Sequence, residues 1–72
     1  MPEMHEVDSS AIEAVGYDAE FRELHVRFKD TGLYVYSGVE EEVAAALLAA
    51  ESKGTHFNQE FKPCGYPYDR RV

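Results

Sequence analysis

Apolar and polar residues alternate most regularly over residues 23–29, which read ELHVRFK. Leu24, Val26 and Phe28 fall on one side of an extended chain, because successive side chains of a β-strand point to opposite faces. The charged neighbours and His25 fall on the other side, where we expect them to face solvent. This pattern predicts a half-buried strand.

Two further stretches complete a predicted antiparallel sheet. Residues 11–18 (AIEAVGYD) read as a strand whose facing stays open, and Gly16 within it indicates a bulge or a close approach of another backbone. Residues 33–37 (LYVYS) follow the sequence Asp-Thr-Gly at 30–32, which is typical of a hairpin turn. We therefore expect three strands joined by short turns.

A helix is predicted over residues 39–52, where Ala and Leu dominate. Ser37 and Glu40 have the spacing of a capping box, in which a Ser side chain and a Glu three residues later satisfy free backbone N–H groups at the helix start. Gly54 is placed to end the helix. The stripe expected to pack on the sheet consists of Val43, Ala46, Leu47 and Ala50.

The opposite side of this helix is apolar as well. Ala44, Ala45 and Leu48 point away from the expected packing stripe. Small side chains on an exposed helix let a second helix approach closely, and a short domain gains stability when such a patch is covered. Unless the C-terminal segment covers the patch, we expect this helix to dock an unknown protein partner or a second copy of the chain. That is the first functional hypothesis.

The two ends of the chain carry weaker patterns. Residues 1–8 form a polar lead-in, and Pro63, Gly65 and Pro67 favour an irregular extension over residues 62–72. We interpret the chain as a single α+β domain over residues 1–72, with a three-stranded antiparallel sheet, one packed α-helix and an irregular C-terminal extension (β-β-β-α). The expected core contains Leu24, Val26, Phe28, Val39, Leu47 and Phe57.

The register of the second hairpin decides where Tyr34 and Tyr36 point. A three-residue loop over residues 30–32 places Phe28 opposite Tyr34 and directs both tyrosines into the core. A four-residue loop over residues 29–32 places Arg27 opposite Tyr34 and turns both rings to the open face, because a slip of one residue moves every side chain to the other side. The core-facing register is favoured, since aromatic residues in strands usually pack.

The charge balance narrows the class of partner. The 72 residues carry seven basic and fourteen acidic side chains, a net charge of −7. Residues 1–51 hold three basic and twelve acidic side chains (−9), whereas residues 52–72 hold four and two (+2). A field of the overall sign repels phosphate backbones at long range, so any nucleic-acid contact has to be local.

Cysteine content and apolar runs bear on the compartment. Cys64 is the single cysteine, which excludes an intramolecular disulfide and a thiolate zinc cluster. The start MPEMHEV lacks the features of a signal peptide, and the longest apolar run, VAAALLAA, is too short to span a bilayer. We expect a cytoplasmic protein without a membrane segment.

No arrangement typical of catalysis is visible. Ser52 and Lys53 are adjacent rather than spaced as a catalytic pair, and no third group orients Cys64 with His56. The N-terminal lead-in lacks the rigid element that a metal site needs. We expect no enzyme activity, no metal and no cofactor, and we expect Ser52 and Asn58 to make local hydrogen bonds.

Four stretches taken together resemble a known family. VDSSAIEAVGYD, LHVRF, LYVYSGV and AESKGTHFN follow one another in the part of the chain between about residues 7 and 61. They are similar to the KTSC domain, a small module named after its occurrence at the C-terminus of some lysyl-tRNA synthetases and also found as stand-alone bacterial proteins. The chain departs from the pattern at Glu40, where family members often have Pro. The resemblance implies the scaffold and no catalytic residues.

The association with a synthetase leads to a second functional hypothesis, an RNA-associated module. If the tyrosines faced outward, their rings would stack bases while neighbouring cations contacted phosphates. This candidate surface consists of Tyr34, Tyr36, His25, Arg27, Lys29 and Lys53, with Arg70 and Arg71 as further cations. A mimic of nucleic acid, which rests on net charge alone, ranks below both hypotheses.

Overall fold

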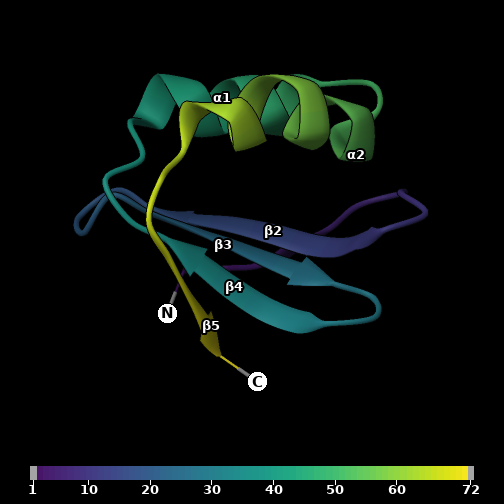
Figure 1. Ribbon diagram of the computed structural model, residues 1–72, viewed down its shortest axis with the longest axis horizontal. Coiled ribbons are helices and arrows are strands. Elements are labelled where there is room, and N and C mark those ends of the chain that lie inside the picture. The colour runs from purple at the N-terminus through teal and green to yellow at the C-terminus, as the bar shows by residue number, and fades with distance from the viewer. Residues whose placement is uncertain (1, 72) are drawn as a thin grey trace.

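The computed structural model describes residues 2–71. Its single sheet has five antiparallel strands in sequence order: β1 (His5–Glu6), β2 (Ile12–Asp18), β3 (Glu23–Phe28), β4 (Gly32–Tyr36) and β5 (Tyr68–Arg71). The helical segments are α1 (Glu41–Ala49), α2 (Lys53–His56), the π-helical η1 (Phe57–Phe61) and the 3-10 turn η2 (Lys62–Cys64). The helical layer lies on one side of the sheet (Figure 1). The fold is α+β, as the pattern predicts.

The expectation of three strands is wrong, because each end of the chain adds a strand. Residues 5–6, within the expected lead-in, pair with β2, and residues 68–71, within the expected irregular extension, pair with β4. Gly65 takes the left-handed conformation (φ 72°) and ends η2, which turns the chain back toward the sheet. The backbone N–H of Ser37 then donates to Pro67 O at 2.9 Å and starts the pairing.

A bulge in β2 accounts for its unclear alternation. Ile12 pairs with Phe28 but Ala14 pairs with Arg27, so one extra residue lies between them. The bulge turns Ile12 and Val15 to the same face, and both are fully buried. The close approach that Gly16 indicates is confirmed, since a Cβ atom there would lie 2.6 Å from the carbonyl oxygen of Glu3.

The helix that we expected over residues 39–52 is shorter, and the capping box does not form. Glu40 stands at the N-cap without a side-chain hydrogen bond. Val39 lies before the helix, and both its backbone groups are bonded to other parts of the chain: its N–H donates to Arg22 O at 2.9 Å, and its carbonyl accepts from the Tyr17 hydroxyl at 2.5 Å. The chain leaves the helix at Ala50, which is extended, well before Gly54.

The buried side of α1 also differs from the expected stripe. Ala44 and Leu47 are buried and Leu48 packs partly against the core, whereas Ala46 is exposed. Val39, which precedes the helix, is itself fully buried in the same core cluster. The apolar patch that we expected over Ala44, Ala45 and Leu48 is therefore mostly used for packing.

Aliphatic side chains from the sheet and α1 make the centre of the core. Of the six residues expected there, five are buried, and Phe28 packs against the cluster while partly exposed. Within residues 2–71, no helix has the length and apolarity needed to cross a membrane. The larger fully buried aliphatic residues of this cluster are Ile12, Val15, Leu24, Val26, Val39 and Leu47.

Candidate functional site: an aromatic pocket

Tyr34 and Tyr36 face the helical layer. Val26 pairs with Tyr34 and Leu24 with Tyr36, so both rings share a face with core residues. The connecting loop has three residues, as in the core-facing alternative, but begins one position earlier because Gly32 pairs with Phe28. Neither of the two registers considered is observed in detail, but the predicted core-facing side is.

These tyrosines belong to a cluster of aromatic rings that contact one another but leave a pocket between them. The Tyr34 and Tyr36 rings lie 6.4 Å apart between centroids with an angle of 20° between their planes. The Tyr68 ring on β5 lies 5.5 Å from Tyr34 and 5.4 Å from Tyr36. Above them, Tyr36 meets Phe57 and Phe61 of η1 edge to face, at 5.7 Å and 5.0 Å. Such edge-to-face pairs are favourable arrangements for aromatic rings.

A pocket of about 520 Å³ lies between the strands β4 and β5 and the segment η1–η2. Aromatic rings make most of its wall, and Lys62 is the one charged residue among the described residues that line it. Asn58 and Thr31 supply the other polar side chains apart from tyrosine hydroxyls. The complete lining is Phe28, Thr31, Tyr34, Tyr36, Phe57, Asn58, Phe61, Lys62, Gly65, Tyr66 and Tyr68.

Two tyrosine hydroxyls of this wall, those of Tyr36 and Tyr66, have raised pKa values. Burial, followed by the neighbouring Tyr68 and Tyr34, raises the pKa of Tyr36 to about 12. Burial also raises the pKa of Tyr66, with smaller contributions from Cys64 and Glu40. Both hydroxyls are therefore protonated at neutral pH and can donate hydrogen bonds to a bound group.

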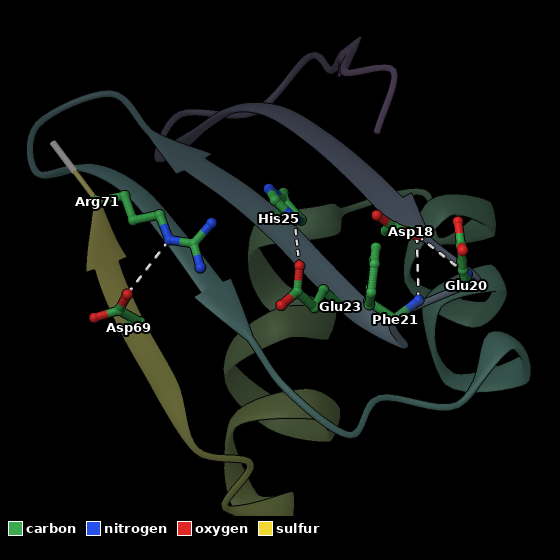
Figure 2. Close-up of polar contacts among 7 residues, drawn as sticks. All are labelled: Asp18, Glu20, Phe21, Glu23, His25, Asp69 and Arg71. Atoms are coloured by element: carbon green, nitrogen blue, oxygen red, sulfur yellow. Dashed lines mark hydrogen bonds and ion pairs between the residues drawn. The ribbon is translucent and has the colours of Figure 1, made fainter. Parts of the chain in front are cut away.

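Cations lie on both faces of β5, next to the pocket. Arg70 pairs with Tyr34 and so points to the helical side, where its Nε donates to Thr31 O at 3.1 Å. Arg71 points to the opposite side, where its Nε lies 3.3 Å from Asp69 Oδ2 (Figure 2). Of the four basic residues in 52–72, Lys62 and Arg70 lie beside the aromatic cluster, whereas Arg71 and Lys53 do not.

The structure does not bring the six candidate residues onto one surface. His25 and Arg27 lie on the face opposite Tyr34 and Tyr36, since they pair with Val35 and Leu33. Lys29 lies in the turn between β3 and β4. The Nζ of the sixth, Lys53, donates to Ala50 O at 2.9 Å at the start of α2.

The expectation that His25 faces solvent is wrong, because the second face of the sheet is also covered. His25 is 2% exposed, and its Nε2 lies 3.4 Å from Glu23 Oε1 (Figure 2). Its Nδ1 is buried without a partner among residues 2–71. Gly16 pairs with His25, and the backbone at Glu3 passes over Gly16, which helps to close this face.

Sequence reasoning missed much of the pocket because it treated the C-terminal extension as irregular. The available signal was the recurrence of aromatic residues at 57, 61, 66 and 68 beside Lys62 and Arg70. The expected role of Ser52 holds, since its Oγ accepts from Thr55 N–H at 3.4 Å and donates to Thr55 Oγ1 at 2.9 Å. Asn58 instead lines the pocket.

Comparisons with known proteins agree in both sequence and structure. The KTSC domain family matches residues 8–66. An uncharacterised protein of Stutzerimonas stutzeri is 48% identical over 64 residues, which is 89% of this chain and 90% of that protein. A protein of Tsukamurella paurometabola is 48% identical over 60 residues, covering 83% and 90%. The crystal structure of a KTSC domain protein from Yersinia pestis superposes with a TM-score of 0.93 at 30% identity, and each chain is covered completely.

Proposed function

The chain belongs to the KTSC domain family, and from this premise we propose that it is a non-catalytic module that binds a partner protein through its aromatic pocket. A large apolar side chain of the partner enters the pocket and packs against the rings of β4, β5 and η1. The observation that carries this proposal is a wall made of seven aromatic residues that the chain leaves unfilled.

The size and chemistry of the pocket suit such a side chain. Its volume of about 520 Å³ falls within the range of about 300–1,000 Å³ in which ligand pockets usually lie. Each favourable ring pair adds about 0.5–1.5 kcal/mol beyond the burial of apolar area. Tyr68, at 61% exposure, presents apolar surface at the pocket edge that a partner would cover.

The titratable groups of the wall favour binding over catalysis. A general base has to be unprotonated near neutral pH before it can accept a proton from a substrate. The raised pKa values of Tyr36 and Tyr66 instead keep both hydroxyls protonated at that pH. Protonated hydroxyls, the Asn58 amide and the Lys62 ammonium are hydrogen-bond donors that orient a bound group.

The test is an NMR titration of the isotope-labelled protein with p-cresol and indole, the side-chain analogues of Tyr and Trp. We expect shifts confined to the pocket wall, with the largest at Phe57, Gly65 and Tyr66. Asn58→Trp fills the pocket from an exposed position and should abolish the shifts, whereas Gln59→Trp, on the same helical turn but outside the wall, should retain them. Shifts spread over the whole surface, or none, would refute the pocket as a binding site.

Single-stranded RNA is a second candidate for the same pocket. It is favoured by the near-parallel rings of Tyr34 and Tyr36 and by Lys62 on a wall whose described residues include no carboxylate. The net charge of −7 acts against it. A titration with a short oligouridylate at low and high salt separates the two: salt-sensitive shifts at the pocket support RNA, and no shifts leave the protein partner.

Self-association through α1 stays a prediction of its own. Ala45, Ala46 and Ala49 are the exposed alanines of this helix. Sedimentation velocity over a range of protein concentrations tests it, together with Ala46→Glu, which should abolish any dimer without disturbing the pocket. A monomer at all concentrations would contradict it.

A further inference from the structure

The outer edge of β5 is open among residues 2–71, because β5 is the last strand of the sheet. Opposite residues of an antiparallel pair alternate between those that bond to each other and those whose backbone groups point away. Ser37 N–H bonds to Pro67 O, so this opposite pair is a bonded one, and the next pair, Tyr36 with Tyr68, is not. The N–H and C=O groups of Tyr68 and Arg70 therefore point outward from the sheet.

The same two residues direct their side chains toward the pocket. Tyr68 is part of the pocket wall, and the Arg70 side chain reaches Thr31, which also lines the pocket. An extended segment paired with β5 would place every second side chain on this helical side, because side chains alternate along a strand. The open edge and the pocket thus form one continuous binding surface.

Charge identifies the chemistry of that segment. Lys62 and Arg70 lie on the helical side of this surface, and the described residues that line the pocket include no carboxylate. The remainder of the molecule is strongly acidic, since residues 1–51 hold twelve acidic and three basic side chains. An acidic segment is attracted here and repelled elsewhere on the protein.

We propose that the partner is an extended acidic segment of another protein that adds a strand to the outer edge of β5. An aromatic side chain of this segment enters the pocket, and carboxylates two residues to either side approach Lys62 and Arg70. This mode of recognition combines backbone hydrogen bonds for affinity with a side-chain pocket for specificity. The inference rests on the proposed function, since it names the partner class for the same pocket.

The probe is the synthetic peptide Ac-TEVWVET-amide, in which Glu, Trp and Glu share one side of an extended chain. We expect binding measured by calorimetry and by NMR shifts at Tyr68 and Arg70. A peptide with Ala in place of Trp should bind at least about tenfold more weakly, and one with Lys in place of both Glu residues should also lose about tenfold.

Two N-methylated forms of this peptide test strand pairing directly. N-methylation removes one backbone donor, and only alternate donors of an added strand face β5. Methylation at Trp and methylation at the preceding Val should therefore differ by at least about tenfold in affinity, which corresponds to about one hydrogen bond plus a steric clash. A greater loss at Trp means an antiparallel strand, and a greater loss at Val means a parallel one. Equal losses would overturn the proposed strand.

Matched protein variants test the same edge from the other side. Arg70→Ala removes the guanidinium, and Arg70→Pro removes in addition an outward N–H that β4 does not use. We expect Arg70→Pro to bind the peptide more weakly than Arg70→Ala by about tenfold or more. Equal affinities of two folded variants would argue against pairing, and the peptide experiment is unaffected if Arg70→Pro does not fold.

The possible outcomes distinguish a failure of strand addition at β5 from a failure of ligand binding in the pocket. If indole occupies the pocket but the peptide does not bind, or binds without a difference between its N-methylated forms, the strand is refuted and the pocket stands. If neither indole nor peptide shifts the pocket residues, both proposals fail. In that case the charges of Arg70 and Arg71 serve to protect an edge strand against aggregation.

Discussion

The two halves of the sheet lie under the same helical layer but are packed in different ways. Under α1, strands β2 and β3 present aliphatic side chains, and Val15, Leu24 and Val26 are all 0% exposed. Under η1, strands β4 and β5 present tyrosines, and a pocket of about 520 Å³ remains between the layers. The two outer edges of the sheet are formed by β1 and β5, and only β5 contributes a residue, Tyr68, to the wall of this pocket.

Side-chain shape explains much of this difference. Branched aliphatic side chains interdigitate and fill the space between two layers at the density of an organic crystal. Flat rings pack edge to face or offset, and at the end of the layer, where cover is supplied by a single π-helical turn, such contacts leave a gap. The aliphatic half is therefore closely packed, whereas the aromatic half contains the pocket.

The largest expected effect comes from breaking the aliphatic half. Leu24→Ala should lower the free energy of unfolding by about 2–5 kcal/mol, because it leaves a cavity in the closed part of the core. Tyr68→Ala, at a ring that is 61% exposed, should cost less than about 1 kcal/mol. Urea denaturation followed by circular dichroism measures both, and similar losses at the two positions would contradict the division into halves.

A smaller loss of stability is expected from disturbing the contact between the N-terminal segment and β2. At Gly16 an added Cβ would lie 2.6 Å from Glu3 O and 2.7 Å from Met4 Sδ, so Gly16→Ala must displace the N-terminal backbone. We expect this displacement to lower the free energy of unfolding by about 1–3 kcal/mol. The matched control is Gly54→Ala, where the nearest atom is Ser9 Oγ at 3.2 Å and the gain in helix propensity of about 1 kcal/mol offsets the crowding. Equal thermal shifts would show that the N-terminal segment is not packed over Gly16.

Removing a tyrosine hydroxyl should lower the free energy of unfolding by about 1 kcal/mol more in the aliphatic half than in the aromatic half. The Tyr17 hydroxyl donates to Val39 O at 2.5 Å, and Tyr17→Phe should cost about 0.5–1.5 kcal/mol because it leaves that carbonyl without its partner. Tyr36→Phe removes a hydroxyl at the pocket, where water can replace its contacts, and should be almost neutral at pH 7. A large loss at Tyr36 in chemical denaturation would indicate a structural role for its hydroxyl.

The smallest effect appears only at alkaline pH. The pKa of Tyr36 is 10.0 in an unfolded chain and about 12 in the folded protein, so its neutral form favours folding below pH 10. As the pH rises from 10 to 12, the unfolded state loses this proton first, and stability falls on the order of 0.5 kcal/mol per pH unit after allowance for partial exposure. Stability curves of Tyr36→Phe should be flatter over this range, and parallel curves would show that the shift is absent.

Some features of this protein follow from sequence alone, because they depend on neighbouring residues. The alternation in Glu23–Phe28 predicted a strand with Leu24 and Val26 buried, and the core-facing side of Tyr34 and Tyr36 was the favoured one of two alternatives. Leu24, Val26 and Leu47 were predictable core residues for the same reason, whereas Ile12 and Val15 were not, because the bulge interrupts the alternation of β2.

Other features depend on contacts between distant residues, and only the tertiary structure decided them. Strands β1 and β5 are defined by their pairing with β2 and β4, and their own residues show little alternation of apolar and polar side chains. The backbone of Val39 is bonded to Arg22 and Tyr17, so α1 begins after this residue rather than at it. The pocket is lined by β4 and by residues more than twenty positions later in the chain. The sequence therefore showed that aromatic residues recur there, but not that they line one pocket. Local sequence patterns were sufficient to predict single strands and their apolar sides. The aromatic pocket depends on the pairing of β5 with β4, which joins residues distant in the sequence.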